Sequence, residues 1–277
     1  MTGPVIRQLT TAEVEQLIGW AEAEGWNPGL DDAAVFQAAD ARGFLGAFAE
    51  GEMAAGISAV RYGEDFGFIG LYICHPDFRG QGYGKAVWNA GLKHLEGRTI
   101  GLDGVPEQQA NYRSMGFVSQ YRTIRYSGHS AHADKAGGIR PLESADMPAV
   151  EAFDRAYFPA PRTGFLRQWL TRPRRALAAF EGSTLRGYGV ARPCREGWKI
   201  GPLFAEDTAV AGSLFAALAE GCEGGIHIDV PETAGDFIRF LEDAGFAPGF
   251  ETSRMYCGPA PAIRLDGVFG ITTLELG

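Results

Sequence analysis

Residues 71–87 read Leu71-Tyr72-Ile73-Cys74-His75-Pro76-Asp77-Phe78-Arg79-Gly80-Gln81-Gly82-Tyr83-Gly84-Lys85-Ala86-Val87. An apolar strand is followed by a turn at Pro76, three alternating glycines and the start of a helix. Because glycine has no Cβ, the backbone amides of such a turn can approach a phosphate closely, and the helix adds its positive N-terminal end. Arg79 adds a fixed charge with paired donors. The stretch therefore predicts a pyrophosphate-binding loop.

Two common phosphate-binding patterns do not fit this loop. The pattern G-x-x-x-x-G-K-[ST] fails because Ala86 stands where Ser or Thr would hold magnesium. The dinucleotide pattern G-x-G-x-x-G fails because Lys85 stands where its third glycine should be. The remaining pattern, R-x-x-G-x-G between a strand and a helix, resembles the acyl-CoA loop of the GNAT superfamily of N-acyltransferases.

A second segment extends the resemblance. Residues 111–117, Asn111-Tyr112-Arg113-Ser114-Met115-Gly116-Phe117, look like the late helix of the same family, in which an aromatic residue precedes a Gly-Phe pair. The resemblance implies an acetyl-CoA-dependent N-acetyltransferase, without a metal, in which an amine attacks the thioester directly in a ternary complex. The residues it implies for acetyl-CoA binding are Tyr72, Ile73, Cys74, Arg79, Gly80, Gln81, Gly82, Tyr83, Gly84 and Asn111.

The resemblance also implies two catalytic roles. The backbone amide near Cys74 would polarise the thioester carbonyl, as in an oxyanion hole. Tyr112 would protonate the leaving thiolate, since the ordinary pKa of a phenol, about 10, exceeds that of a thiol, about 8.5. The alternative for Tyr112 is a core tyrosine at a sheet edge. Covalent catalysis by the Cys74 thiol is disfavoured because it needs a basic partner, and His75 points to the opposite face of the strand.

The acceptor side of the site carries a weaker signal. The segment between the first two predicted helices combines an aromatic ring, an amide and carboxylates, so Trp26, Asn27 and Asp31 are candidate acceptor contacts. Asp31 is equally typical of a helix N-cap, and Trp26 of a lid on the core. The general base is not identified. Glu64 and Asp65 lie where several relatives place a carboxylate, but both also suit a hairpin turn.

The sequence repeats itself with a period of about 130 residues, one domain length. Matching pairs include 44–48 with 176–180, 69–72 with 200–203, 102–106 with 228–231, and 116–117 with 245–246. In the second copy, residues 205–213 replace the loop, with no arginine and with Glu206 and Asp207, which would repel phosphate. We predict domains at 1–128, with the acetyl-CoA loop, and at 138–277, without it, joined by a Gly-rich linker.

Within one copy, hairpin-linked strands precede strands that alternate with helices. This order predicts an α+β fold of two tandem GNAT-like domains, each a mixed, mostly antiparallel sheet flanked by helices. Residues 263–277 are predicted to form edge-strand material. Five arginines of the second copy predict a solvated basic face, or a contact with an acceptor carboxylate or with CoA phosphates; they are Arg162, Arg167, Arg172, Arg174 and Arg175.

The composition limits the partners. The 277 residues carry a net charge of −9, which argues against nucleic acid and anionic membrane surfaces. The four cysteines and five histidines are scattered, so no metal site is predicted, and the absence of a leader or an apolar span predicts a cytoplasmic protein. Expected partners are acetyl-CoA and a small-molecule amine, for a monomer or homodimer. The alternatives are a protein or peptide acetyltransferase, acting on lysine or an N-terminus, and a non-catalytic CoA-binding sensor.

Overall fold

The chain folds as two halves with the same order of elements. The first half contains β1 (Val5–Gln8), α1 (Thr11–Ala23), α2 (Asp32–Ala39), β2 (Phe44–Ala49), β3 (Glu52–Tyr62), β4 (Phe66–Cys74), α3 (Tyr83–His94), β5 (Thr99–Gly104), α4 (Pro106–Ser114) and β6 (Val118–Gly128). The second contains β7 (Ile139–Pro141), α5 (Met147–Tyr157), α6 (Thr163–Trp169), β8 (Arg175–Glu181), β9 (Thr184–Pro193), β10 (Trp198–Ala205), α7 (Thr208–Ala219), β11 (Ile226–Pro231), α8 (Gly235–Asp243), β12 (Ala247–Cys257) and β13 (Val268–Gly270).

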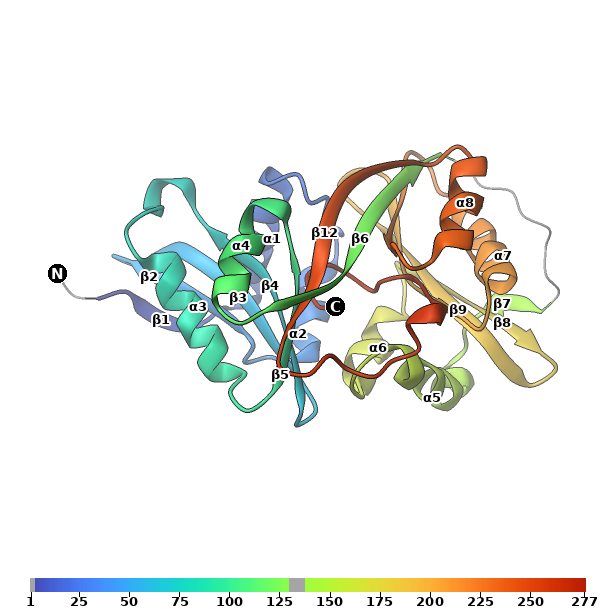
Figure 1. The fold of residues 1–277 in the computed structure, drawn as a ribbon, viewed down its shortest axis with the longest axis horizontal. Coiled ribbons are helices and arrows are strands. Elements are labelled where there is room, and N and C mark those ends of the chain that lie inside the picture. Colours follow the sequence, from blue (N-terminus) through green and yellow to red (C-terminus); the bar gives the residue numbers. More distant parts are fainter. Residues whose placement is uncertain (1–2, 130–137) are drawn as a thin grey trace.

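The computed structural model describes residues 3–129 and 138–277. The predicted linker falls mainly on residues 130–137, which lie outside the described residues. One continuous sheet runs through both halves, with the order β1-β2-β3-β4-β5-β12-β6-β11-β10-β9-β8-β7 and β13 beside β10. Figure 1 shows β12 and β6 where the two halves meet. Most neighbours are antiparallel, while β4–β5 and β10–β11 are parallel. The prediction of two mixed, mostly antiparallel halves flanked by helices is confirmed.

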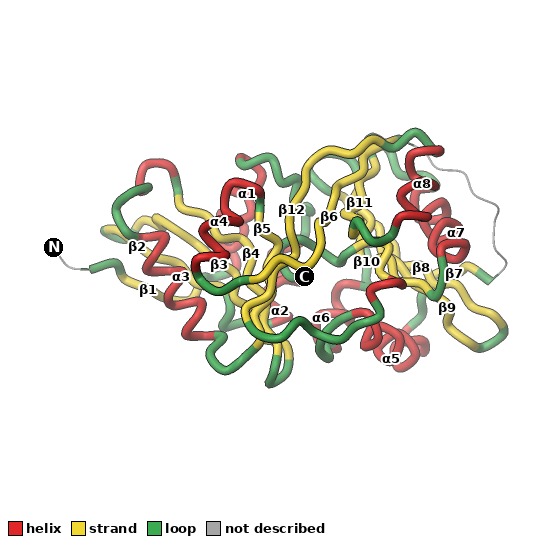
Figure 2. The backbone as a smooth tube through the Cα atoms, in the orientation of Figure 1, coloured by secondary structure: helices red, strands yellow, loops and turns green. Residues whose placement is uncertain are grey.

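Strands β6 and β12 each pair with the other half. Strand β12 lies between β5 and β6, with Arg254 opposite Asp103 of β5 and Ser253 opposite Arg122 of β6. Strand β6 in turn pairs with β11. Figure 2 shows β12 and β6 side by side between the halves. Residues of the second half are therefore carried into the part of the sheet that the first half forms.

Helices cover both faces of the sheet in the first half. Helix α1 starts at a capping box in which the Thr10 hydroxyl accepts from the Glu13 amide and the Glu13 carboxylate accepts from the Thr10 amide. On one face, α1 and α2 pack in the cluster that contains Phe68, and on the other α3 packs in the cluster that contains Ile69. Consecutive strand residues point to opposite faces, so β4 is covered on both sides. No helix in the described ranges is long and apolar enough to cross a membrane.

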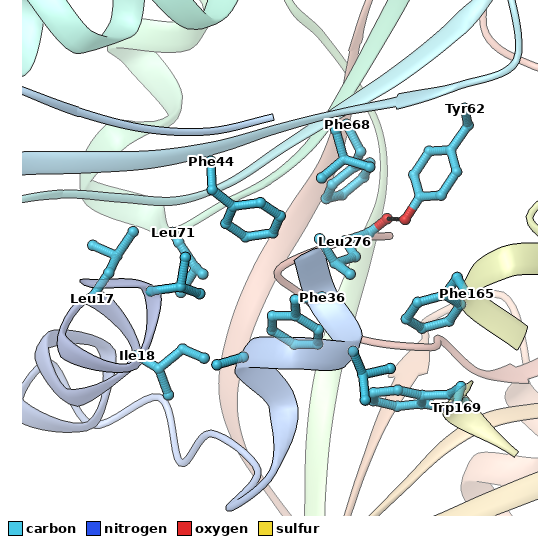
Figure 3. Close-up of a cluster of buried hydrophobic side chains, with 14 of the residues drawn as sticks. Leu17, Ile18, Phe36, Phe44, Tyr62, Phe68, Leu71, Phe165, Trp169 and Leu276 are labelled. Atoms are coloured by element: carbon cyan, nitrogen blue, oxygen red, sulfur yellow. Dashed lines mark hydrogen bonds between the residues drawn. The ribbon is translucent and has the colours of Figure 1, made fainter. Parts of the chain in front are cut away.

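The last residues of the chain cross from the second half to the first. The Ser58 hydroxyl donates to the Glu275 carbonyl and the Tyr62 hydroxyl to the Leu276 carbonyl, each at 3.1 Å. Gly70 of β4 is required here, since a Cβ would lie 2.2 Å from the Glu275 carbonyl oxygen. Figure 3 shows Leu276 within the apolar core, hydrogen-bonded to Tyr62. The prediction of edge strands in this tail is confirmed only for β13, because residues 274–276 form a turn against β4.

The predicted basic face of the second half is wrong for two of its five arginines. Arg162 is 5% exposed and pairs with Asp154, Nη2 to Oδ1 at 2.6 Å. Arg174 is also 5% exposed and pairs with Asp32 of the first half at 3.0 Å. Buried guanidinium groups need such partners because desolvation of an unpaired charge is unfavourable. These two arginines therefore hold helices together and are not available to a phosphate.

Candidate active site

A cavity of about 530 Å³ opens beside the middle of the sheet. Its first-half lining comes from the end of α1, from β4 and β5, from Arg79 and from α4. The second half adds Phe250 and Thr252 from β12, and Leu274 and Glu275 from the tail. This volume lies in the range of pockets that enclose small ligands.

The cavity exists because β4 and β5 separate. They pair only along Phe66–Ile69 and Thr99–Leu102. Directly afterwards the register between β3 and β4 shifts, and Leu71 adopts φ 46°, a conformation unfavourable for a leucine. Such a bulge re-aims the strand. The backbone of Tyr72–Cys74 therefore borders the cavity without pairing to β5, and its groups are available to a bound chain.

The predicted pyrophosphate loop leads from β4 into α3. Gly80 has φ 77° and Gly82 has φ 90°, and a Cβ at either would meet nothing within 4 Å. Helix α3 begins at Tyr83, and its N-cap residue, Gly82, has no side chain to cap the first amides. An open glycine turn before an uncapped helix N-terminus fits an anionic phosphate. The loop residues after Arg79, from Gly80 to Gly84, lie outside the cavity lining.

Arg79 joins the loop to the cavity. Its Nη2 donates to the Glu24 carboxylate at 2.7 Å and its Nε to the Cys74 carbonyl at 3.1 Å. Arg79 and Glu24 both line the cavity, and both side chains are largely exposed. A surface pair of this kind is weak, so the guanidinium can be shared with a phosphate at the same edge.

The equivalent helix of the second half has a different start. Helix α7 is capped by Asp207, whose Oδ1 accepts from the Val210 amide at 2.9 Å. The carboxylate thus occupies the position where α3 leaves its amides uncapped. Glu206 beside it pairs with Arg186. This helix start has neither the free amides nor the unpaired positive charge that a pyrophosphate needs.

Tyr112 lies on the cavity wall. Its ring stacks on Trp88 of α3, with ring centroids 5.5 Å apart and planes 25° apart. Gly104 allows this packing, since a Cβ there would lie 3.1 Å from the Tyr112 ring. Burial, and to a lesser extent neighbouring Tyr72, raises the pKa of Tyr112 above its ordinary value. The phenol therefore keeps its proton at neutral pH, as a proton donor must.

The Cys74 side chain is unsuited to nucleophilic attack. Burial raises the pKa of its thiol, against an opposing hydrogen bond from the Gly84 amide. His75 packs on the other face of the sheet, against Trp20 with ring centroids 5.3 Å apart, while Cys74 packs on the α3 face. Among the residues that the structure describes, the thiol thus has no adjacent base, and the backbone of Cys74 remains its candidate contribution.

Of the predicted acceptor contacts, Trp26 lines the cavity. Both halves hold it there, because Arg125 of β6 and Lys199 of β10 donate to its carbonyl, at 3.1 and 3.3 Å. Arg125 also pairs with Asp229 at 2.8 Å. Burial alone would raise the pKa of Asp229, but Arg125 and Lys199 outweigh it and lower that pKa to about 2. A fixed set of buried charges thus places the acceptor-side loop.

Four other candidates lie away from the cavity. The Asn27 amide exchanges two hydrogen bonds of 2.9 Å with the Glu196 backbone. Asp31 is exposed and does not line the cavity, nor does its side chain cap α2. Glu64 and Asp65 sit in the exposed turn between β3 and β4. The structure therefore does not bring these residues together with Tyr112, whereas it does bring Asn111 to the lining.

The contribution of the second half was not predicted from the sequence. Thr252 and Glu275 line the cavity although they are 140 or more residues from Tyr112 in the chain. One signal was present in Leu274-Glu275-Leu276, where a carboxylate stands between two leucines in a segment predicted to be a strand. No group of three or more His, Cys, Asp or Glu in the described part of the chain is arranged to hold a metal ion.

Both halves match models of one acetyltransferase family. Residues 11–118 match the acetyltransferase (GNAT) family and residues 150–270 an acetyltransferase (GNAT) domain. The chain is 35% identical over 262 residues to the holothin acyltransferase of Pseudoalteromonas sp. (strain SANK 73390), covering 93% of this chain and 89% of the relative. It is 25% identical over 214 residues to an uncharacterized N-acetyltransferase of Bacillus subtilis (strain 168), covering 76% of each.

Solved structures share the whole architecture. A putative acetyltransferase from Pyrococcus horikoshii has a TM-score of 0.85 at 22% identity, covering 100% of this chain and 97% of the other. A tandem GNAT protein from the clavulanic acid biosynthesis pathway has a TM-score of 0.63 at 14% identity, covering 93% and 99%. At these sequence identities, the similarity between the structures shows the shared fold alone.

The two family matches define an acyltransferase made of two tandem domains. The chain belongs to the GNAT family of N-acetyltransferases, an enzyme family that uses acetyl-CoA. The predicted family and tandem arrangement are confirmed.

Proposed function

We propose that this enzyme transfers the acetyl group of acetyl-CoA to the primary amine of a small molecule, in a site of the first half that the second half completes. The observation that carries the proposal is the shared cavity. It joins the unpaired end of β4 and Arg79 to Tyr112, and its far wall comes from Phe250, Thr252 and the tail.

The parts of the first half then have separate roles in binding acetyl-CoA and in catalysis. Arg79, the glycine turn and the N-terminus of α3 bind the pyrophosphate. The free backbone of Tyr72–Cys74 binds the pantetheine arm, with Asn111 of α4 beside it, and the amide near Cys74 donates to the carbonyl oxygen. The amine attacks the carbonyl carbon with its lone pair, the C–S bond breaks with its electrons on sulfur, and Tyr112 donates the proton that sulfur takes up.

The second half does not repeat this arrangement. We propose that it binds no acetyl-CoA, because the Asp207 carboxylate caps α7 where the phosphate would lie. Its roles are to close the acceptor side with β12 and the tail, and to hold the Trp26 loop through Lys199, which donates to the Trp26 and Asn27 carbonyls. A cavity bounded by both halves suits a small acceptor better than an extended peptide.

The test is acetyl-CoA-dependent release of free thiol with different amines. Holothin is the first probe because the 35% identical relative is named for it; 2-phenylethylamine and a lysine-containing peptide complete the set. We expect kcat/KM for a small amine to exceed that for the peptide about 100-fold or more. Release with the peptide alone would support a peptide acetyltransferase. No release with any amine, in a protein that still binds acetyl-CoA, would support the sensor alternative.

A further inference from the structure

We propose that Glu275 and Thr252, both supplied by the second half, bind the acceptor nitrogen and select an amine with an apolar body and no carboxylate. The inference rests on the proposed function and names the part of the cavity that the family loop does not explain.

Glu275 is a buried residue, and one of its carboxylate oxygens, Oε2, has no hydrogen-bond partner among the described residues. The residue is 3% exposed, and its Oε2 is fully buried and bonded to none of the described residues. Its backbone is fixed by Ser58 and by close contact with Gly70. Burial of an unbonded carboxylate is unfavourable unless a ligand supplies the missing donor. Because Glu275 also lines the cavity, that donor is available from the ligand side.

Charged residues lie around the Glu275 carboxylate without supplying a hydrogen bond to its Oε2. Arg125 of β6, Arg192 of β9 and Lys199 of β10 lie within electrostatic range of its carboxylate, as does Asp103 of β5. Arg125 donates to Asp229 and Lys199 to the Trp26 carbonyl. Arg192 donates through Nη1 to the Thr272 carbonyl, while its Nε and Nη2 have no hydrogen-bond partner among the described residues. A carboxylate held by charge but not by donors keeps its acceptor capacity for an amine N–H.

Thr252 carries a second buried polar atom without a hydrogen-bond partner at the same cavity. It is 2% exposed, and its Oγ1 has no partner among the described residues. Phe250, two residues earlier on β12, lies on the same face of the strand and also lines the cavity, as does Trp26. Two buried polar groups without hydrogen-bond partners, next to aromatic side chains, suit an acceptor whose amine is attached to an apolar body.

The charge of the lining argues against a carboxylate on the acceptor. Its acidic residues are Glu24, Asp103, Glu107 and Glu275, and its basic residue is Arg79, at the cofactor edge. A second carboxylate brought to Glu275 would meet a like charge at low dielectric. The acceptor is therefore expected to enter as a simple amine.

Glu275 also receives a proton in the proposed step. As the nitrogen lone pair forms the new C–N bond, the N–H becomes acidic and Glu275 takes its proton. The C–S bond breaks with its electron pair on sulfur, which takes the Tyr112 proton. Water then returns a proton to Tyr112 and removes the one on Glu275, so the protons balance.

The experiment compares Glu275→Gln with Glu64→Gln, a glutamate in the exposed turn away from the cavity. With holothin or 2-phenylethylamine as acceptor, we expect Glu275→Gln to lower kcat/KM about 100-fold or more, and Glu64→Gln by less than about threefold. Both variants should keep the rise in melting temperature caused by acetyl-CoA.

Thr252→Val should raise the acceptor KM about tenfold. Phenylalanine, which is 2-phenylethylamine with a carboxylate, should be at least about tenfold worse as an acceptor.

The outcomes separate this inference from the proposed function. Wild-type thiol release combined with an active Glu275→Gln variant, or with phenylalanine used as readily as 2-phenylethylamine, would overturn the inference alone. No thiol release by wild type with any amine would overturn the proposed function. If Glu275→Gln does not fold, Thr252→Val decides, since it removes a hydroxyl that has no structural partner; an unchanged acceptor KM would then contradict the inference.

Discussion

Replacing Tyr112 by phenylalanine is expected to lower kcat about 100- to 10,000-fold, the usual contribution of general acid catalysis. The ring stays in place because its stacking on Trp88 does not involve the hydroxyl. The change therefore removes the proton donor and little else. Since burial raises the pKa of the phenol, its proton is retained through neutral and mildly alkaline pH, and no loss of rate between about pH 7 and 10 should come from Tyr112.

Steady-state kinetics and thermal melting check this prediction together. Tyr157→Phe is a matched control, because Tyr157 is buried in the second half and its hydroxyl has no partner among the described residues. The control should keep kcat within about threefold, and both variants should melt within a few degrees of wild type. A Tyr112→Phe enzyme with nearly wild-type kcat would show that Tyr112 is a core residue, the alternative that its sequence position also allows.

Asp154→Asn is expected to destabilise the protein by about 3–5 kcal/mol, as removal of one partner from a buried ion pair usually does. Asp154 accepts from Arg162 Nε at 2.9 Å and from Nη2 at 2.6 Å, and also from the Tyr188 hydroxyl. An asparagine has the same shape but presents an NH2 group to one of these donors. In the variant, Arg162 remains buried but loses its charged partner at position 154. It keeps its hydrogen bond to Thr272 at 2.8 Å, which anchors the tail.

Urea unfolding followed by circular dichroism measures the effect. The control is Asp236→Asn, which removes an ion pair with Arg239 whose side chains are 70% and 71% exposed. That change should cost less than about 0.5 kcal/mol. Equal unfolding midpoints for the two variants would contradict the account of Arg162 as a buried structural cation.

Much of the fold could be predicted from local sequence. The loop at Arg79–Gly84, the late Tyr112 segment and the internal repeat each depend on residues near one another in the chain, and together they indicated two tandem halves. The predicted glycine turn matches the observed one, with positive φ at Gly80 and Gly82. These features follow from backbone geometry that a short motif specifies.

The exchange of β6 and β12 was not predictable from those motifs. Both strands are 11 residues long and mix polar with apolar residues, so their sequence does not indicate which strand each will pair with. The acceptor side depends on that choice, because β12 brings Thr252 and the tail brings Glu275. The prediction of a basic face in the second half was wrong for a related reason, because the ion-pair partners could not be identified from the sequence. Arg162 pairs with Asp154, 8 residues away, and Arg174 with Asp32, 142 residues away.

Isothermal titration with acetyl-CoA tests the central claim, that one half binds the cofactor and the other completes the acceptor site. The account predicts one acetyl-CoA per chain, with binding lost in Arg79→Ala/Gly82→Ala, because the variant removes the fixed charge and strains a turn that needs positive φ. Loss of binding should remove the melting-temperature rise as well. Two acetyl-CoA per chain, or unchanged binding in the variant, would contradict it.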